Sequence, residues 1–318
     1  MSDAPIAPRE RNILEKIFVS PGQDRARAGW RIVLHTLLLF FALACISTIL
    51  ILTLASLGTD MSSNVSYDLF FFLNELTFVI SVTVATFLAR RFIDRRPIAS
   101  LGLKINRQMA YDLLTGILIA FVMQGSIFLA ELSLGWTKVD GFAWQTQAGP
   151  ALAAGAGLWL LTFIIGGWSE ELLSRGYHLQ NLADGLNLFW GVLISSSVFA
   201  LLHLSNPNAS WISTLGILLA GLFLALPYLL TRQLWLSIGL HIGWNFFEGV
   251  VFGFPVSGLN TYRLLLHTVS GPLLWTGGEF GPEAGLLVVP ALLLGALLVY
   301  GYTRLGLRNA LSPKTDPS

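Results

Sequence analysis

Residues 151–177 read ALAAGAGLWLLTFIIGGWSEELLSRGY. No charged residue precedes Glu170 in this run, and about 20 apolar residues are enough for a helix to cross the hydrocarbon of a bilayer. The pattern predicts a membrane-spanning helix that continues, at its far end, into the carboxylates Glu170 and Glu171 and the guanidinium of Arg175.

The rest of the chain has the same character. Of 318 residues, 54% are hydrophobic and 12% are charged, about half the charged share of an average soluble domain. We predict an all-α polytopic membrane protein with about eight transmembrane helices and a buried active-site cavity. The expected spans cover about 32–57, 69–89, 113–134, 151 to beyond 170, 188–204, 211–230, 234–252 and 286–302.

Charged side chains divide the chain into three parts. We expect a cytoplasmic N-terminal segment at 1–29, a transmembrane domain at 30–305 and a cytoplasmic tail at 306–318. Arginine and lysine gather before the first apolar run and after the second, and positive charge favours the cytoplasmic side. An even number of spans with both termini cytoplasmic follows, and the plasma membrane is the expected location. The Gly- and Pro-rich segment 253–285 is then extracytoplasmic.

Charge and cysteine content exclude several classes of partner. The formal net charge is +1, which gives no basic field for binding nucleic acid. Because 54% of the residues are hydrophobic, membrane lipid is the expected surrounding. The only cysteine, Cys45, lies within the first apolar run. Neither a disulfide nor a cysteine-ligated zinc site can form within one chain.

The carboxylates at the end of the 151–171 run are the first sign of chemistry. Ionisable groups in hydrocarbon cost several kcal/mol each, so they need a partner, a wet cavity or an interface. Arg175 lies four residues after Glu171 and shares its helical face, whereas Glu170 points about 100° away. We expect Arg175 to hold Glu171 and to leave Glu170 as a general base that takes a proton from water.

Two histidines carry the same helical spacing. His203 follows Phe199 by four residues, and Asn245 follows His241 by four, so each pair shares one face. Phe199 is expected to serve packing and not chemistry.

The depths of these groups can be compared along the chain. Glu170 and His203 lie roughly 16 residues on either side of a turn near 185–187 and come level in an antiparallel hairpin. His241 follows shortly after Arg232, so the hairpin has to extend beyond the start of the helix that carries His241.

These three motifs, Glu-Glu-x-x-x-Arg, Phe-x-x-x-His and His-x-x-x-Asn, resemble those of the CPBP family. The family includes prenyl-protein (CAAX) endopeptidases of the Ras-converting-enzyme type, Abi proteins and bacteriocin self-immunity proteins, and the resemblance covers about 152–249. It implies a membrane fold of eight or so helices and peptide hydrolysis. By position, the resemblance implies that Glu170 and His203 activate water, His241 and Asn245 stabilise the oxyanion, and Glu171 and Arg175 support the site.

Metal dependence stays open at this point. Glu170, His203 and His241 offer a 2-His-1-carboxylate set suited to Zn²⁺ or another divalent ion. The His-Glu-x-x-His helix is absent, and a carboxamide such as that of Asn245 is a poor zinc ligand. We expect no required cofactor, with a zinc-dependent enzyme as the alternative.

The sequence therefore predicts an intramembrane endopeptidase of the CAAX-protease type that acts on a membrane-anchored peptide, prenylated or not. A non-catalytic bacteriocin-immunity or partner-binding protein is the alternative, and a proton-coupled transporter is disfavoured because no inverted repeat is visible. Glu75 and Glu131 lack a motif. We expect them to bond between helices or to lie at an interface, with a place in the cavity lining as the alternative.

Overall fold

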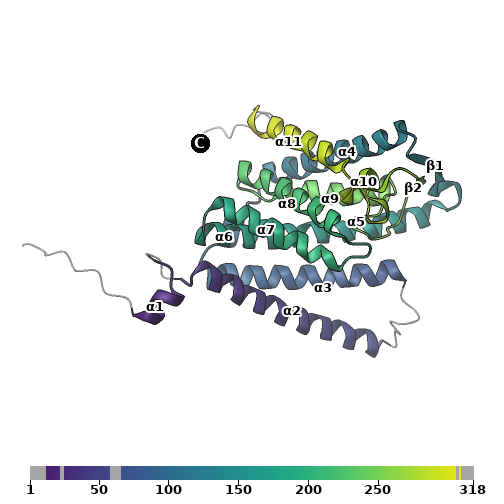
Figure 1. Cartoon of the computed structure of the whole chain (residues 1–318). Coiled ribbons are helices and arrows are strands. Elements are labelled where there is room, and N and C mark those ends of the chain that lie inside the picture. The colour runs from purple at the N-terminus through teal and green to yellow at the C-terminus, as the bar shows by residue number, and fades with distance from the viewer. Residues whose placement is uncertain (1–11, 22–24, 58–65, 306–307, 309–318) are drawn as a thin grey trace, which may run out of the picture.

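The computed structural model describes residues 12–21, 25–57, 66–305 and 308 of the chain. Residues 1–11 and 22–24 of the expected cytoplasmic segment 1–29, and all of the expected tail 306–318 except residue 308, lie outside the described residues. The described chain is a bundle of helices with one short two-stranded antiparallel sheet, which confirms the all-α prediction (Figure 1).

Six helices of the described chain are long and apolar enough to cross a membrane. They are α2 (Ala28–Ser56), α3 (Tyr67–Leu88, continued by the π-helical turn η1, Ala89–Ile93), α4 (Arg107–Ser133), α5 (Gly149–Glu171, continued by the π-helical η4, Leu172–His178, and α6, Leu179–Gly185), α7 (Leu188–Leu202) and α8 (Trp211–Thr231). The other two expected spans correspond to α9 (Trp235–Asn245, continued by η6, Phe246–Val251) and α11 (Val288–Arg304), which are shorter. The count of eight is not confirmed.

Polar caps explain where several helices begin. The side chain of Asn106 accepts a hydrogen bond from the backbone N–H of Met109 at the start of α4, and Asn187 accepts one from Trp190 at the start of α7. Asparagine is among the preferred N-cap residues because its side chain satisfies a free N–H of the first turn. The turn expected near 185–187 lies between α6 and α7.

Helix α9 runs through the middle of the bundle and packs closely against α4. A Cβ on Gly239 would collide with the carbonyl oxygen of Leu113, and one on Gly243 would lie 2.8 Å from the Cα of Ile117. The glycines on this face let the two backbones approach closely, as small residues do between membrane helices. His241 lies between the two glycines in sequence, so this packing also fixes its place.

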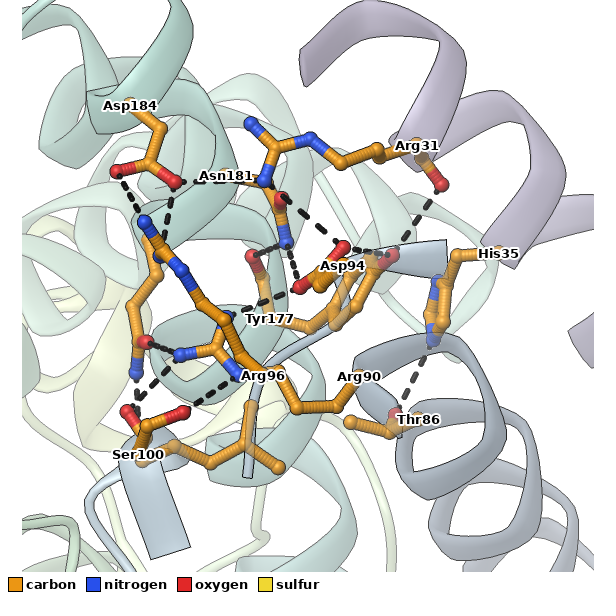
Figure 2. Close-up of polar contacts among 12 residues, drawn as sticks. Arg31, His35, Thr86, Arg90, Asp94, Arg96, Ser100, Tyr177, Asn181 and Asp184 are labelled. Atoms are coloured by element: carbon orange, nitrogen blue, oxygen red, sulfur yellow. Dashed lines mark hydrogen bonds and ion pairs between the residues drawn. The ribbon is translucent and has the colours of Figure 1, made fainter. Parts of the chain in front are cut away.

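A buried network of arginines and aspartates joins α2, η1 and α6 at one end of the bundle (Figure 2). Asp94 accepts hydrogen bonds from Arg90 at 3.0 Å and from Tyr177 at 3.2 Å, and Arg31 of α2 lies 3.3 Å from Asp184. Several arginines near this end therefore tie helices together as well as carrying charge.

The two ends of the described chain lie at this same end of the bundle (Figure 1). Tyr302 near the end of α11 donates to Asp112 near the start of α4 at 2.9 Å, and Arg308 lies 2.9 Å from the same carboxylate. Helix α1 (Ile13–Phe18) extends from this end as well.

The α6–α7 hairpin extends beyond the start of α9. Gln180 donates to the carbonyl of Leu101 at 2.9 Å, and the N–H of Leu234 donates to the carbonyl of Gly102 at 2.9 Å. Gln180 and the start of α9 are therefore level, and the residues after Gln180 project further. This is the arrangement that equal depth of Glu170 and His241 requires.

The segment after η6 folds back over the other end of the bundle. Strand β2 (Leu265–Val269) pairs antiparallel with β1 (Thr137–Phe142), and the short helices α10 (Leu273–Thr276), η7 (Gly278–Phe280) and η8 (Pro282–Ala284) follow. A Cβ on Gly216 of α8 would collide with the carbonyl oxygen of Glu283 in η8. Part of the segment therefore inserts against α8.

Candidate active site

Glu171 is the buried centre of the site. It is fully enclosed on α5, and its Oε1 accepts from Arg175 Nη1 at 2.7 Å and from His241 Nδ1 at 2.8 Å. Nη2 of Arg175 donates to the carbonyl of Gly221 at 2.8 Å. The predicted Glu171–Arg175 contact is present, and the same carboxylate also reaches α9.

The two histidines turn the same ring nitrogen towards Glu170. Nε2 of His203 lies 3.9 Å and Nε2 of His241 lies 3.7 Å from Glu170 Oε2. Both distances exceed a direct hydrogen bond. The structure thus brings together three side chains from α5, from the end of α7 and from α9, as the sequence predicts.

The second ring nitrogen of each histidine defines how the ring is held. Nδ1 of His203 lies 2.8 Å from the carbonyl of Phe199, and Nδ1 of His241 lies 2.8 Å from Glu171. A carbonyl or carboxylate oxygen only accepts, so in each neutral ring Nδ1 carries the hydrogen and Nε2 presents a lone pair. Phe199 also packs beneath Arg175, whose Cζ lies 4.6 Å from the ring centroid.

A cavity of about 270 Å³ opens beside these groups. Its walls are mostly apolar, with aromatic and aliphatic side chains from α3, α5, α7, α8 and α9. The polar lining comprises Glu75, Thr162, Glu170, Ser174, His203, Asn206, His241, Asn245, Ser257 and Glu283. Asn245 therefore reaches the same cavity as His241, one helical turn further along.

The motifs leave six of these polar lining residues unidentified, among them Glu75, Ser257 and Glu283. Glu75 of α3 lines the cavity, whereas the sequence favours a contact between helices or an interfacial position. Ser257 and Glu283 come from the segment 253–285, where no pattern marks them. The hydroxyl of Ser257 donates to Glu283 Oε2 at 2.6 Å, and Trp244 donates to Oε1 at 3.1 Å. Glu131, by contrast, accepts from Thr137 at 2.6 Å and does not line the cavity.

The 2-His-1-carboxylate set of Glu170, His203 and His241 is wider than a tetrahedral zinc site. Tetrahedral ligands about 2.1 Å from zinc lie about 3.4 Å apart. The Nε2 atoms of His203 and His241 lie farther from Glu170 Oε2, at 3.9 and 3.7 Å. Within the described ranges, no group of three or more His, Cys, Asp or Glu side chains has a geometry that could hold a metal ion.

Fold and cavity together define an all-α integral membrane protein with a cluster of carboxylates and imidazoles inside its bundle. A family model described as type II CAAX prenyl endopeptidase Rce1-like matches residues 152–247. The matched region runs from α5 to the start of η6, and the match supports the CPBP, or CAAX protease, family, which points to a peptidase. No curated protein matches the chain.

Proposed function

We propose that the protein is an intramembrane endopeptidase that hydrolyses a peptide bond of a membrane-anchored substrate with water activated by Glu170 and His203. The observation that carries the proposal is the convergence of both histidine Nε2 atoms on Glu170 Oε2 at the wall of a largely apolar cavity. A carboxylate and an imidazole in this arrangement can bind one water and accept its proton as it attacks a carbonyl carbon.

The oxyanion has two donors in this proposal. With Nδ1 held by Glu171, a protonated His241 donates from Nε2, and the carboxamide of Asn245 supplies a second N–H from the next turn of α9. Donors of this kind each contribute about 3–4 kcal/mol to transition-state stabilisation. Glu171 and Arg175 orient His241 and do not touch the substrate.

The substrate class follows from the cavity and the family. Apolar walls suit a lipid-anchored or membrane-spanning peptide, and the matched family is described by its prenylated substrates. We propose that the reaction needs no metal, with zinc dependence as the alternative. We propose that the protein lies in the plasma membrane. The arginine-rich end of the bundle, where the described chain begins and finishes, then faces the cytoplasm.

The test is cleavage of membrane-anchored peptides, prenylated and unprenylated, by the purified full chain, with and without a chelator. We expect cleavage that survives chelation and is lost in Glu170→Gln, because the amide cannot accept the proton of water. Glu131→Gln, a buried glutamate away from the cavity, is the matched control and should cleave normally.

Three results would redirect the proposal. Loss of cleavage on chelation with recovery on zinc would establish the metal alternative. Undiminished cleavage by Glu170→Gln would remove the glutamate from the mechanism. Absence of cleavage for every peptide would favour a partner-binding or immunity role.

A further inference from the structure

Besides Glu170, the cavity is lined by the carboxyl groups of Glu283 and of Glu75, and Glu75 lies on a helix outside the family match. It lies on α3, and its Oε2 would be 3.6 Å from a Cβ on Gly166 of α5. Gly166 and Glu170 are four residues apart and share one helical face. The Glu75 carboxyl therefore packs against the turn of α5 at Gly166, which has no side chain and lies one turn before the proposed base, Glu170.

The surroundings of Glu75 favour its neutral form. Its Oε2 is buried and has no hydrogen-bond partner. The cavity wall next to it on α3 is formed by Phe71 and Phe78, and the charged forms of Glu170 and His241 act on it within the same cavity. An ionised carboxylate without a partner is strongly disfavoured in such a site, and a second carboxylate nearby adds repulsion.

Among the described residues that line the cavity with this carboxyl, none is a lysine or an arginine. Arg175, which lies beside the site, is engaged by Glu171 and by the carbonyl of Gly221. The two cavity carboxyls of α3 and α5 thus differ: Glu170 faces two imidazoles, and Glu75 faces none closely enough for a hydrogen bond.

We propose that Glu75 is a further catalytic residue, the general acid that protonates the leaving nitrogen; this inference rests on the peptidase function proposed above. Amide hydrolysis needs such a donor because an unprotonated amide anion is a very poor leaving group. A neutral carboxyl one helical turn from the base, in the same cavity, can reach the nitrogen side of a peptide bond whose carbonyl carbon faces Glu170.

The proton balance closes with these two groups. Water gives one proton to Glu170 and its oxygen bonds to the carbonyl carbon. When the tetrahedral intermediate collapses, the C–N bond breaks and the nitrogen takes the proton of Glu75, which gives a carboxylic acid and an amine. The proton on Glu170 then passes to Glu75, directly or through water, and restores the starting state.

The experiment compares two substrates with the same acyl group, a cleavable peptide and its p-nitrophenyl ester. The phenolate leaves without a proton, whereas the amine does not. For Glu75→Gln we expect peptide cleavage to fall about 100-fold or more and ester hydrolysis to fall less than about threefold. Glu75→Asp, which keeps the acid, should recover part of the peptide activity, and Glu131→Gln should match the wild type on both substrates.

The outcomes separate this inference from the function on which it rests. Retained ester hydrolysis also shows that Glu75→Gln is folded. Equal losses on both substrates, or no loss on either, would overturn the role of Glu75 while cleavage by the wild type still supports the peptidase. If Glu170→Gln cleaved the peptide normally, or if the wild type cleaved no peptide, the proposed function would fail and the role of Glu75 with it.

Discussion

Glu170 and Glu171 are neighbours in sequence but lie in different environments, because successive side chains on a helix point about 100° apart. Glu171 is enclosed by Arg175 and His241, while Glu170 faces the cavity. The spacing of four residues is enough to predict the Glu171–Arg175 contact. It cannot predict the bond between Glu171 and His241, which lies 70 residues further along the chain.

At the scale of single residues, we predict that Arg175→Met destabilises the protein by about 3–5 kcal/mol, because the buried Glu171 carboxylate loses its cationic partner. The measurement is the free energy of unfolding in mild detergent. Arg91→Met, on an exposed arginine of η1, is the control and should change it by less than about 0.5 kcal/mol. Equal stability of the two variants would mean that the Glu171–Arg175 pair does not hold the site together.

At the scale of elements, apolar run length predicts most helices to within a few residues. Helix α9 lies at the centre of the bundle for a reason that run length does not reveal. Its glycines face α4, and Gly116 on α4 faces α9 in turn. A Cβ on Gly116 would lie only 2.6 Å from the backbone N of Leu240 in α9. Such pairing depends on two segments far apart in sequence, so it becomes visible only in the folded chain.

We predict that Gly239→Ala impairs both stability and cleavage, because the added methyl group forces α9 away from Leu113 and moves His241 relative to Glu170. Overpacking of this kind costs about 1–3 kcal/mol. Gly157→Ala in α5, where a Cβ meets nothing within 4 Å, is the matched control and should be neutral or slightly stabilising. Thermal unfolding and peptide cleavage measure the two effects, and normal values for both in Gly239→Ala would contradict this account of the packing.

At the scale of the whole molecule, the segment 253–285 is the part about which the sequence predicts least. The prediction assigns it an extracytoplasmic place but no role, because its Gly- and Pro-rich pattern has no periodicity to interpret. In the structure it supplies Ser257 and Glu283 to the cavity, and Asn206 donates to the carbonyl of Ser257 at 2.9 Å. The contact between Asn206 and Ser257 joins the segment that precedes α8 in sequence to the segment that follows α9.

We predict that Glu283 makes the contribution of the segment 253–285 to stability depend on pH. Burial raises the pKa of its carboxyl above the ordinary value. The folded state therefore holds the proton more tightly than the unfolded chain, and its contribution to stability is greatest below about pH 4.3 and declines as pH rises towards the raised pKa. The difference in unfolding midpoint between wild type and Glu283→Gln should fall across this window. An unchanged difference would show that Glu283 does not titrate on unfolding.

The most direct test of the central claim is cleavage of a membrane-anchored peptide in ¹⁸O-labelled water, followed by mass spectrometry of the fragments. The account predicts one ¹⁸O atom in the new carboxyl group with the wild-type protein, an unlabelled free amine on the other fragment, and no fragments with Glu170→Gln. Fragments formed by Glu170→Gln at the wild-type rate would contradict it.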